Sequence, residues 1–256
     1  MTKKLIPWVA ALLLATGSAA NAASFINGGF EDGSFSGWTG GGGSWTGSPS
    51  SPVNPATYAA GTSNNTVTGA ALDPITGAPV TYTGSHGARI NDRNNDYSVS
   101  TLSQSVSNYT DNSIFFAWNA VLQASHDLTD SDYFSLTLRD DTDGIDLVNR
   151  AYSSAGSIGA GASGVTWTTY GDWFSSGWVV ELIDVAALGA LGHDFTMTLL
   201  ASDCPYGGHA GYVYIDGFGS TAPPGGDVPE PASLALIGLG LAAVAGLRRR
   251  YSSAAA

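Results

Sequence analysis

The chain has 256 residues, of which 43% are hydrophobic and only 12% are charged, and its formal net charge is −12. The central part of the sequence, from Ser24 to Asp227, contains no lysine. Its four arginines oppose 20 acidic residues, the 21 of the whole chain less Glu230, so its formal charge is −16. A surface with this excess of acidic groups repels phosphate. Nucleic acid and anionic lipid are therefore excluded as partners of this part of the chain.

The cysteine count limits the kind of domain. Cys204 is the one cysteine of the chain, so an intramolecular disulfide is excluded. A segment of about 200 residues is long enough to bury a hydrophobic core without stabilising disulfides. We therefore expect a single domain over residues 24–220, followed by a short linker over 221–227.

The first residues have the pattern of a secretory signal peptide. Lys3 and Lys4 precede an apolar segment from Leu5 to Ala15, and Ala20-Asn21-Ala22 fits the A-x-A cleavage pattern. We predict a helical signal peptide over residues 1–22, cleaved after Ala22, with Ala20 or Ala23 as alternative cleavage points. The protein is therefore expected outside the cytoplasm.

Two motifs mark the start and the end of the expected domain. The first is Asn27-Gly28-Gly29-Phe30-Glu31, and the second is the run Gly211–Phe218, which contains Asp216. Together they resemble the first and last strands of the galactose-binding-like jelly roll found in many carbohydrate-binding modules. The resemblance implies that these two segments lie side by side, at a place where several of these families hold a structural calcium ion.

Calcium prefers six to eight oxygen ligands, mostly carboxylates and backbone carbonyls. Glu31 and Asp216 would supply the carboxylates, and the turn at Asn27 and Gly28 would supply carbonyls. In the alternative interpretation, Glu31 is a solvated residue and Asp216 caps a turn. Ca²⁺ is therefore a candidate structural cofactor, and no other cofactor is expected.

Residues 40–85 differ in composition from the rest of the domain. They are dominated by Gly, Ser, Thr, Asn, Ala and Pro, with few large apolar side chains. A segment of this kind buries too little surface to offset the entropy of ordering it. We expect a long loop or insertion that carries a few short strands.

The remaining residues predict an all-β fold, an antiparallel β-sandwich of the jelly-roll type. Short alternating or apolar runs recur between turn residues, and almost no segment has the period of an amphipathic helix. The runs are Tyr97–Val106, Ser113–Leu122, Tyr133–Arg139, Val165–Tyr170, Trp178–Ile183, Phe195–Ala201 and Tyr212–Phe218. Only Val185–Leu191 predicts a helical turn, with Asp184 as its N-cap.

The acidic turn Asp140–Gly144 does not fit a calcium loop of the EF-hand type. With Gly144 at the glycine position of such a loop, Arg139 falls at the first ligand position and Arg150 at the last. We interpret the segment as a solvated hairpin turn, with weak cation binding as the alternative.

Aromatic residues are concentrated between Trp167 and Trp178. Alternation places these two tryptophans in the core, whereas Trp173 stands between two glycines and is expected to be exposed. Aromatic faces beside carboxylate and amide groups suit the stacking of sugar rings. Tyr170, Asp172 and Trp173 are therefore a candidate sugar platform, and core filling is the alternative interpretation.

The sequence contains no constellation typical of an enzyme class. It lacks a Gly-x-Ser-x-Gly elbow, a His-Glu-x-x-His pair and a phosphate-binding loop. Cys204 and His209 would form a thiolate and base pair, but no motif surrounds a third catalytic group, and two ligands fall short of a structural zinc site. We expect a buried Cys204, a hydrogen-bonding His209 in a turn, and no catalytic activity.

The C-terminal residues have three parts: a short motif, an uncharged apolar run over residues 232–247, and a basic cluster. The run is slightly shorter than the roughly 17 to 25 residues that span a bilayer as a helix, and the basic cluster would hold its end on the cytoplasmic side. We predict a transmembrane helix over 232–247 within a sorting signal over 228–251. The motif and the cluster are Val228, Pro229, Glu230 and Pro231, and Arg248, Arg249 and Arg250.

This order closely resembles the PEP-CTERM sorting signal of Gram-negative bacteria. The resemblance implies transient anchoring in the inner membrane and processing by an exosortase-type enzyme. It further implies delivery to the cell surface or to an extracellular polysaccharide matrix. An ordinary single-pass anchor is the alternative interpretation of the same hydrophobic pattern.

Together these patterns predict an exported protein that acts as a structural or carbohydrate-adhesive module in the cell envelope or in the matrix of a biofilm, with polysaccharide as its partner. One alternative is a polysaccharide hydrolase that depends on calcium or on a pair of acids. The other is an architectural matrix protein that binds no ligand.

Overall fold

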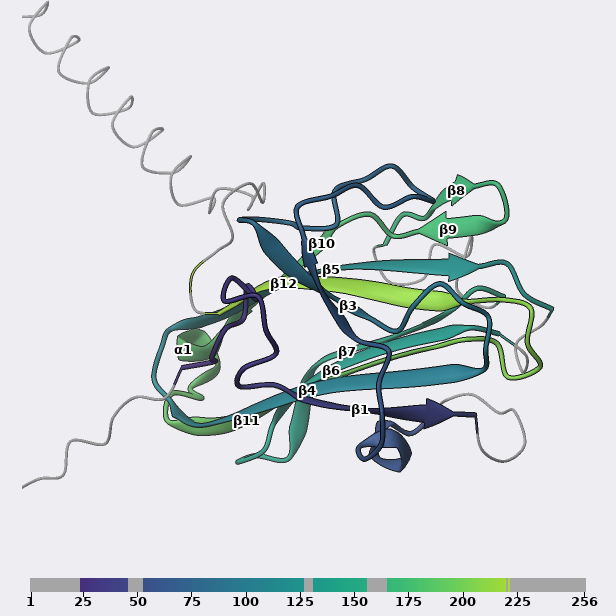
Figure 1. Cartoon of the computed structure of the whole chain (residues 1–256). Helices are drawn as coiled ribbons and strands as arrows, with labels where there is room; N and C mark the ends of the chain where they lie inside the picture. The colour runs from purple at the N-terminus through teal and green to yellow at the C-terminus, as the bar shows by residue number, and fades with distance from the viewer. Residues whose placement is uncertain (1–23, 46–52, 127–130, 156–164, 220, 222–256) are drawn as a thin grey trace, which may run out of the picture.

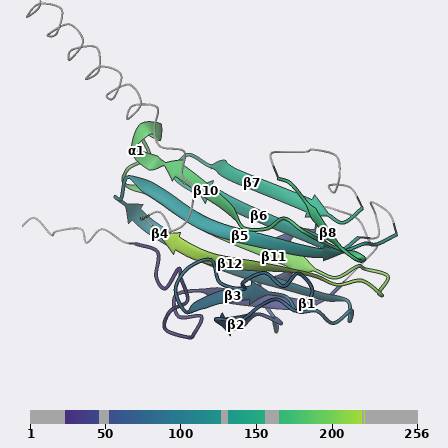
Figure 2. The ribbon, with the colours of Figure 1, turned by 90° about the horizontal axis from the view of Figure 1, so that it is seen from above.

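The computed structural model describes residues 24–45, 53–126, 131–155, 165–219 and 221. They form two antiparallel sheets stacked face to face (Figure 1, Figure 2). The predicted all-β antiparallel fold is thereby confirmed. Within these ranges no helix is both long enough and apolar enough to cross a membrane. The predicted signal peptide and the predicted transmembrane helix over 232–247 lie outside the described residues.

The first sheet, called sheet A, has five strands in the order β1-β4-β11-β6-β7. All its neighbouring strands are antiparallel. The strands are β1 (Thr39–Ser44), β4 (Ser98–Tyr109), β11 (His193–Ser202), β6 (Tyr133–Asp140) and β7 (Ile145–Ser153).

The second sheet, called sheet B, has the order β2-β3-β12-β5-β9-β8, and β10 also pairs with β5. The first half of β5 pairs with β10 and its last residues pair with β9, so β5 lies in the middle of the sheet along its whole length. The strands are β2 (Thr66–Gly69), β3 (His86–Ile90), β12 (Gly211–Gly219), β5 (Ser113–Gln123), β9 (Trp173–Ser175), β8 (Thr168–Tyr170) and β10 (Val179–Asp184).

Helical structure in the described ranges is confined to two short elements, η1 (Pro55–Tyr58) and α1 (Val185–Leu188). The Asp184 carboxylate accepts a hydrogen bond of 2.9 Å from the backbone N–H of Ala187, which confirms the predicted N-cap. The helix α1 and the β8–β9 hairpin lie at opposite ends of the sandwich (Figure 1).

Alternating side chains build the core between the two sheets. In β11, Phe195, Met197 and Leu199 are fully buried and belong to this core. Thr196 and Thr198 between them point to the outer face of sheet A, as the period of a strand requires.

The largest fully buried side chain is Trp118 of β5. Its ring centroid lies 5.1 Å from that of Phe134 and 5.6 Å from that of Tyr152, both in the facing sheet. Its indole N–H donates to Glu181 Oε1 at 3.3 Å, and Glu181 also pairs with Arg150 through bonds of 2.7 and 2.8 Å. Aromatic packing and a two-pronged ion pair therefore join the sheets at the centre and at one side.

The glycine-rich segment forms β1, and the short helix η1 packs directly on its backbone. A Cβ atom added at Gly41 would lie 2.2 Å from the carbonyl oxygen of Tyr58 in η1. Gly41 pairs with Thr101 of β4. The absence of a side chain at Gly41 thus lets η1 pack against the backbone of the strand. A larger residue at this position would collide with η1.

We predict that Gly41→Ala lowers the free energy of unfolding by about 1 to 3 kcal/mol, the usual cost of overpacking. Gly69→Ala in β2 is the matched control, because its Cβ would meet no atom within 4 Å. Chemical denaturation of both variants measures the difference. Equal stability of the two variants would contradict the close packing of η1 on β1.

The turn between β6 and β7 is held by Asp140. Its Oδ1 accepts hydrogen bonds from the backbone N–H groups of Thr142 and Asp143, and its Oδ2 lies 2.8 Å from His193 Nδ1. Burial opposes ionisation of Asp140, but these hydrogen bonds outweigh it and lower its pKa. The same bond raises the pKa of His193 above 6.5. The hairpin turn predicted for Asp140–Gly144 is therefore present, but Asp140 is buried, whereas a solvated turn was expected.

The Asp140–His193 pair predicts a defined pH dependence of stability. The contribution of His193 is complete below pH 6.5 and is lost as the pH rises through its raised pKa. The contribution of Asp140 is present above pH 3.8 and is lost as the pH falls through its lowered pKa. His193→Gln should therefore destabilise the fold more at pH 5.5 than at pH 9, as measured by denaturation at each pH. An equal loss at both pH values, or the same pH dependence in an Asp140→Asn background, would contradict the pairing.

Candidate functional site

The β8–β9 hairpin places two aromatic side chains next to each other. Tyr170 and Trp173 are directly opposite residues, joined by a turn at Gly171 and Asp172 in which Gly171 has φ +64°. Opposite residues of an antiparallel pair point to the same face. Both side chains are half-buried, so each keeps part of its surface exposed.

A third strand extends this row with an amide. Gln123, the last residue of β5, is paired with Trp173 and therefore lies on the same face. Its Nε2 donates to Asp172 Oδ2 at 2.8 Å, and its Oε1 accepts from the backbone N–H of Ala210 at 3.1 Å. The structure thus brings the three residues of the predicted sugar platform together and adds Gln123. We call these four residues, Tyr170, Asp172, Trp173 and Gln123, the aromatic row.

Trp173 was expected to be exposed, and the structure shows it half-buried. Its ring lies 5.9 Å from that of Tyr212, in a cluster on the outer face of sheet B that also contains Tyr214 and Val80. Asp73 accepts hydrogen bonds of 2.8 Å from the hydroxyls of both tyrosines. Burial opposes its ionisation, but these and other hydrogen bonds lower its pKa. Trp173 therefore rests on a fixed layer of side chains.

The predicted calcium residues lie beside the last strand, as expected from the sequence. Gly28 accepts a hydrogen bond of 3.1 Å from the backbone N–H of Phe218, and a Cβ at Gly28 would lie 1.7 Å from the Phe218 carbonyl oxygen. A Cβ at Gly29 would lie within 3.7 Å of both Glu31 and Asp216. The two carboxylates therefore approach the same small region.

Both carboxylates already accept backbone hydrogen bonds from one loop. Asp216 Oδ2 accepts from the N–H groups of Tyr82 and Thr83 at 2.8 Å, and Glu31 Oε1 accepts from those of Ser85 and His86 at 2.9 and 3.1 Å. Burial raises the pKa of Asp216 to about 6, against the effect of these bonds. Burial opposes the ionisation of Glu31 as well, but there the hydrogen bonds prevail and lower its pKa.

The expected carbonyl ligands are engaged elsewhere. The Asn27 carbonyl accepts from the backbone N–H of Phe30 at 3.1 Å and from the indole N–H of Trp38 at 3.2 Å, and the Gly28 carbonyl accepts from Phe218. The described geometry therefore fits a pair of acids that holds the loop over residues 82–86 against the last strand. Calcium binding by Glu31 and Asp216 stays a prediction, because it needs oxygen atoms where N–H groups now point.

The two interpretations differ in how Glu31→Gln behaves. The hydrogen bonds predict that this substitution lowers the unfolding temperature by the same amount with calcium and with chelator, because the amide keeps one acceptor oxygen but loses the charge. A calcium site predicts instead that calcium raises the unfolding temperature of the unaltered chain and not that of the variant. Thermal unfolding of both chains with each addition decides between them.

A groove of about 370 Å³ lies on the outer face of sheet A, beside η1. Its polar lining is formed by hydroxyl groups and one amide, from Thr39, Asn54, Thr101, Ser103, Thr137, Thr196 and Thr198. No aromatic or charged side chain lines this groove. It offers hydrogen bonds to a polar ligand but no flat apolar surface for a ring.

Two further acids are buried near the end of the sandwich that carries the aromatic row. Burial raises the pKa of Asp203 to about 7 and that of Asp132 well above its usual range. Asp203 accepts from Ser98 and from the Asn91 side chain, and Asp132 accepts from the backbone N–H of Gln123 and from the Ser154 hydroxyl. Both side chains are fully buried. They therefore secure loops and offer no surface to a polysaccharide.

The structure places His126 beside Cys204 and His209, a grouping that the sequence did not predict. Ligand atoms of these three side chains all lie within 4.8 Å of one another. Cys204 is buried, His209 is half-buried and His126 is exposed. In the sequence, the elements from β6 to β11 lie between His126 and the other two residues. No local spacing in the sequence therefore signals the cluster.

Sequence comparison identifies the C-terminal signal. Residues 227–250 match the model of the PEP-CTERM protein-sorting motif, which confirms the assignment of this segment. The motif indicates an exported, exosortase-processed protein. Its predicted functional residues, from Val228 to Pro231 and from Arg248 to Arg250, lie outside the described residues. No curated protein matches the sequence.

Solved structures with a similar arrangement include carbohydrate-binding modules. TmCBM61 in complex with β-1,4-galactotriose is 13% identical, with a TM-score of 0.39 over 76% of this chain and 95% of that one. The CBM22-1 xylan-binding domain of Paenibacillus barcinonensis Xyn10C is 16% identical, with a TM-score of 0.33 over 78% and 96%. CBM27-1 of Caldicellulosiruptor saccharolyticus, in complex with mannohexaose, is 8% identical, with a TM-score of 0.36 over 75% and 93%. Similarity at this low identity concerns the arrangement of strands and does not indicate what this chain binds.

Proposed function

We propose that the protein is a carbohydrate-adhesive module, exported to the cell surface or the extracellular matrix of a Gram-negative bacterium, which binds polysaccharide through the aromatic row. The single observation that supports this most directly is the row itself. Tyr170, Trp173 and Gln123 are neighbours across three strands and share one face. The body is proposed to be a jelly roll of the galactose-binding-like type, without catalytic activity.

The chemistry of the row suits a pyranose ring. The apolar face of a sugar packs on an aromatic ring, and its hydroxyls need donors and acceptors at the edge of that ring. Tyr170 and Trp173 supply the flat surface, and the Asp172 carboxylate stands in the turn between them. The bond of 2.8 Å from Gln123 fixes this carboxylate before a ligand arrives, which reduces the entropy cost of binding.

The sorting signal sets the context for this proposal. A protein exported and processed at a PEP-CTERM motif meets the polysaccharides outside the cell, and its strongly acidic surface disfavours anionic partners. Neutral or cationic polysaccharides are therefore the proposed ligand class. We further propose that the apolar run over 232–247 anchors the chain in the inner membrane until the exosortase acts.

Substitution of the two aromatic residues tests the proposal. Tyr170→Ala and Trp173→Ala should each weaken retention on immobilised extracellular polysaccharide by about 10-fold or more, which corresponds to a loss of about 1.4 kcal/mol. Affinity electrophoresis of the purified chain in gels with neutral polysaccharide, together with a glycan array, gives the measurement. Retention unchanged in both variants would overturn the proposal.

Two controls separate binding from folding and from the other candidate surface. Trp178→Ala removes a half-buried tryptophan from the same outer face, where its indole N–H donates to the Pro79 carbonyl at 3.1 Å. An equal loss of retention in this variant would point to a structural effect and contradict a contact role for Trp173. Thr137→Val and Thr198→Val alter the groove on sheet A, and loss of retention there would place the ligand in that groove instead.

A further inference from the structure

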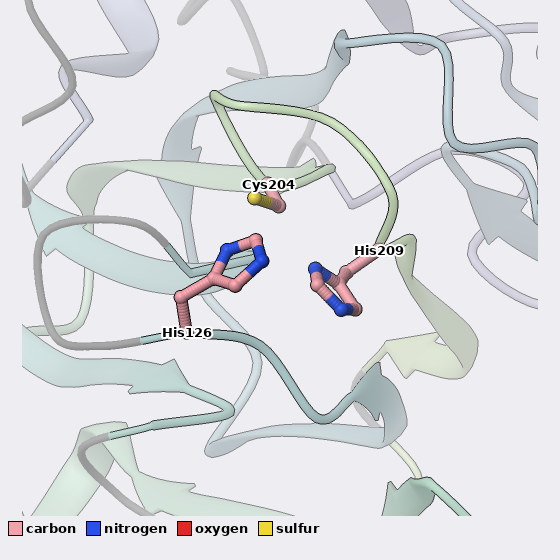
Figure 3. Close-up of side chains that lie close together, drawn as sticks. All are labelled: His126, Cys204 and His209. Carbon is pink, nitrogen blue, oxygen red and sulfur yellow. The ribbon is translucent and has the colours of Figure 1, made fainter.

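The cluster of His126, Cys204 and His209 lies beside the aromatic row but is separate from it. Figure 3 shows the rings of His126 and His209 side by side, with Cys204 next to them. The two ring centroids are 4.7 Å apart and the planes cross at 78°. The side chains come from two loops, one after β5 and the other between β11 and β12.

The loop between β11 and β12 holds two of these side chains in a fixed relation. The backbone N–H of Cys204 donates to the carbonyl of His209 at 3.0 Å, and that of Gly207 donates to the carbonyl of Cys204 at 3.0 Å. Gly207 and Gly208 have φ of +83° and +91°, which lets the chain reverse within this short turn. Cys204 and His209 therefore face each other across a closed turn.

The residue before Cys204 anchors this turn to the rest of the fold. The Asp203 backbone N–H donates to the Ser98 carbonyl at 2.9 Å, and the Asp203 carbonyl accepts from the Trp45 indole N–H at 2.6 Å. Its carboxylate accepts from Asn91 Nδ2 at 3.0 Å and from the Ser98 hydroxyl at 3.0 Å. Cys204 is thus carried on a backbone that is bound on several sides, and its sulfur is fully buried.

The loop that carries His126 is tied to the same turn. The backbone N–H of Gln123 donates to the Ala210 carbonyl at 3.1 Å, and that of Ala124 donates to the Asp172 carbonyl at 2.6 Å. These bonds hold the end of β5 next to His209 and leave His126 exposed at the rim of the cluster. The three side chains therefore converge through main-chain contacts and not through a chance approach of long, mobile side chains.

The donor set matches a borderline-soft metal ion. Thiolate and imidazole are the usual ligands of Zn²⁺, with Zn–S near 2.3 Å and Zn–N near 2.0 to 2.1 Å. A tetrahedral ion with such bonds holds its ligand atoms roughly 3.4 to 3.6 Å apart. The atoms here lie within 4.8 Å of one another, so a shift of the side chains by about 1 Å would bring them to the spacing of such a site.

We propose that His126, Cys204 and His209 bind a divalent transition-metal ion of the zinc type, with the fourth coordination position open to water. On binding, the Cys204 thiol loses its proton to solvent and its sulfur forms the bond to the metal, while each neutral imidazole donates one nitrogen lone pair. The ion would join the end of β5 to the β11–β12 turn, so it would also fix the aromatic row from the side of Gln123.

Cobalt substitution tests this site directly. The purified full chain, stripped with chelator under reducing conditions, is titrated with Co²⁺ and then with Zn²⁺. The expected result is a thiolate-to-cobalt charge-transfer band in the near ultraviolet, visible bands of four-coordinate cobalt, and loss of both on addition of Zn²⁺. Absence of the near-ultraviolet band would overturn the proposal.

Single substitutions identify the ligands. Cys204→Ser should abolish the near-ultraviolet band, and His126→Gln and His209→Gln should each weaken Co²⁺ binding by about 10-fold or more, since loss even of an outer-shell partner costs that much. His86→Gln, which alters a histidine outside both groups of side chains that could hold a metal ion, should leave the titration unchanged. A band that survives unchanged in both ligand histidine variants would overturn the three-ligand site.

Folding of each variant is checked by thermal unfolding without metal. His126→Gln keeps the test decisive even if Cys204→Ser does not fold, because His126 is exposed. Polysaccharide retention is a separate readout of the aromatic row. Loss of cobalt binding with normal retention, or the reverse, therefore tells apart a failure of the metal site and a failure of the proposed function.

Discussion

The packing of β5 against the facing sheet is the interaction on which the rest of the structure depends. The chain has one cysteine and so no internal disulfide, and helical structure in the described ranges is limited to single turns. Stability must therefore come from apolar burial between the two sheets. Trp118 lies at the centre of that layer. Its strand pairs with β9 of the β8–β9 hairpin at one end and with β10, which leads into α1, at the other. Both the aromatic row and the cluster of His126, Cys204 and His209 lie at the end of β5 that is formed by Gln123.

The acidic residues of this chain serve a second purpose besides surface charge. Asp73, Asp203 and Asp216 are buried, and each accepts several hydrogen bonds from residues that are distant in sequence. A buried carboxylate needs such donors, because desolvation would otherwise make its ionised form costly. Where burial prevails, as for Asp203 and Asp216, the pKa rises, and where donors prevail, as for Asp73, it falls. Long irregular loops are thereby ordered without a large core beneath them.

The sequence predicted best those strands whose side chains alternate between core and surface. The runs that became β4, β6 and β11 differ from the observed strands by at most a few residues, because one face of each is buried. The strand β7 was not predicted, since it lies at the edge of its sheet and its exposed and buried residues do not alternate regularly, which weakens the apolar period. The four glycines of β1 carry no side-chain period at all. The backbone of Tyr58 lies too close to Gly41 for a Cβ atom, and that of Thr62 lies too close to Gly42, which explains glycine at these two positions.

The candidate sites show the same division between local and distant information. Tyr170, Asp172 and Trp173 are close in sequence, so a hairpin was enough to bring them together. The approach of Gln123 and His126 depends on the pairing of β5 with β9 and β12, which no local pattern contains. The carbonyls of Asn27 and Gly28 were expected to face Asp216. They instead accept hydrogen bonds from the N–H groups of Phe30, Trp38 and Phe218, because a backbone carbonyl needs a donor and an ionised carboxylate offers none.

The register of the last strand sets the orientation of the molecule when it is tethered. Gly211 is paired with Leu122, at the end that carries the aromatic row, and Gly219 is paired with Phe115, eight residues further along β12 and near α1. At the rise of a strand this is a separation of roughly 25 Å. A chain held by the residues that follow Gly219 is thus held at the end opposite the aromatic row. In a chain held there, the length of the sandwich separates the aromatic row from the point of attachment.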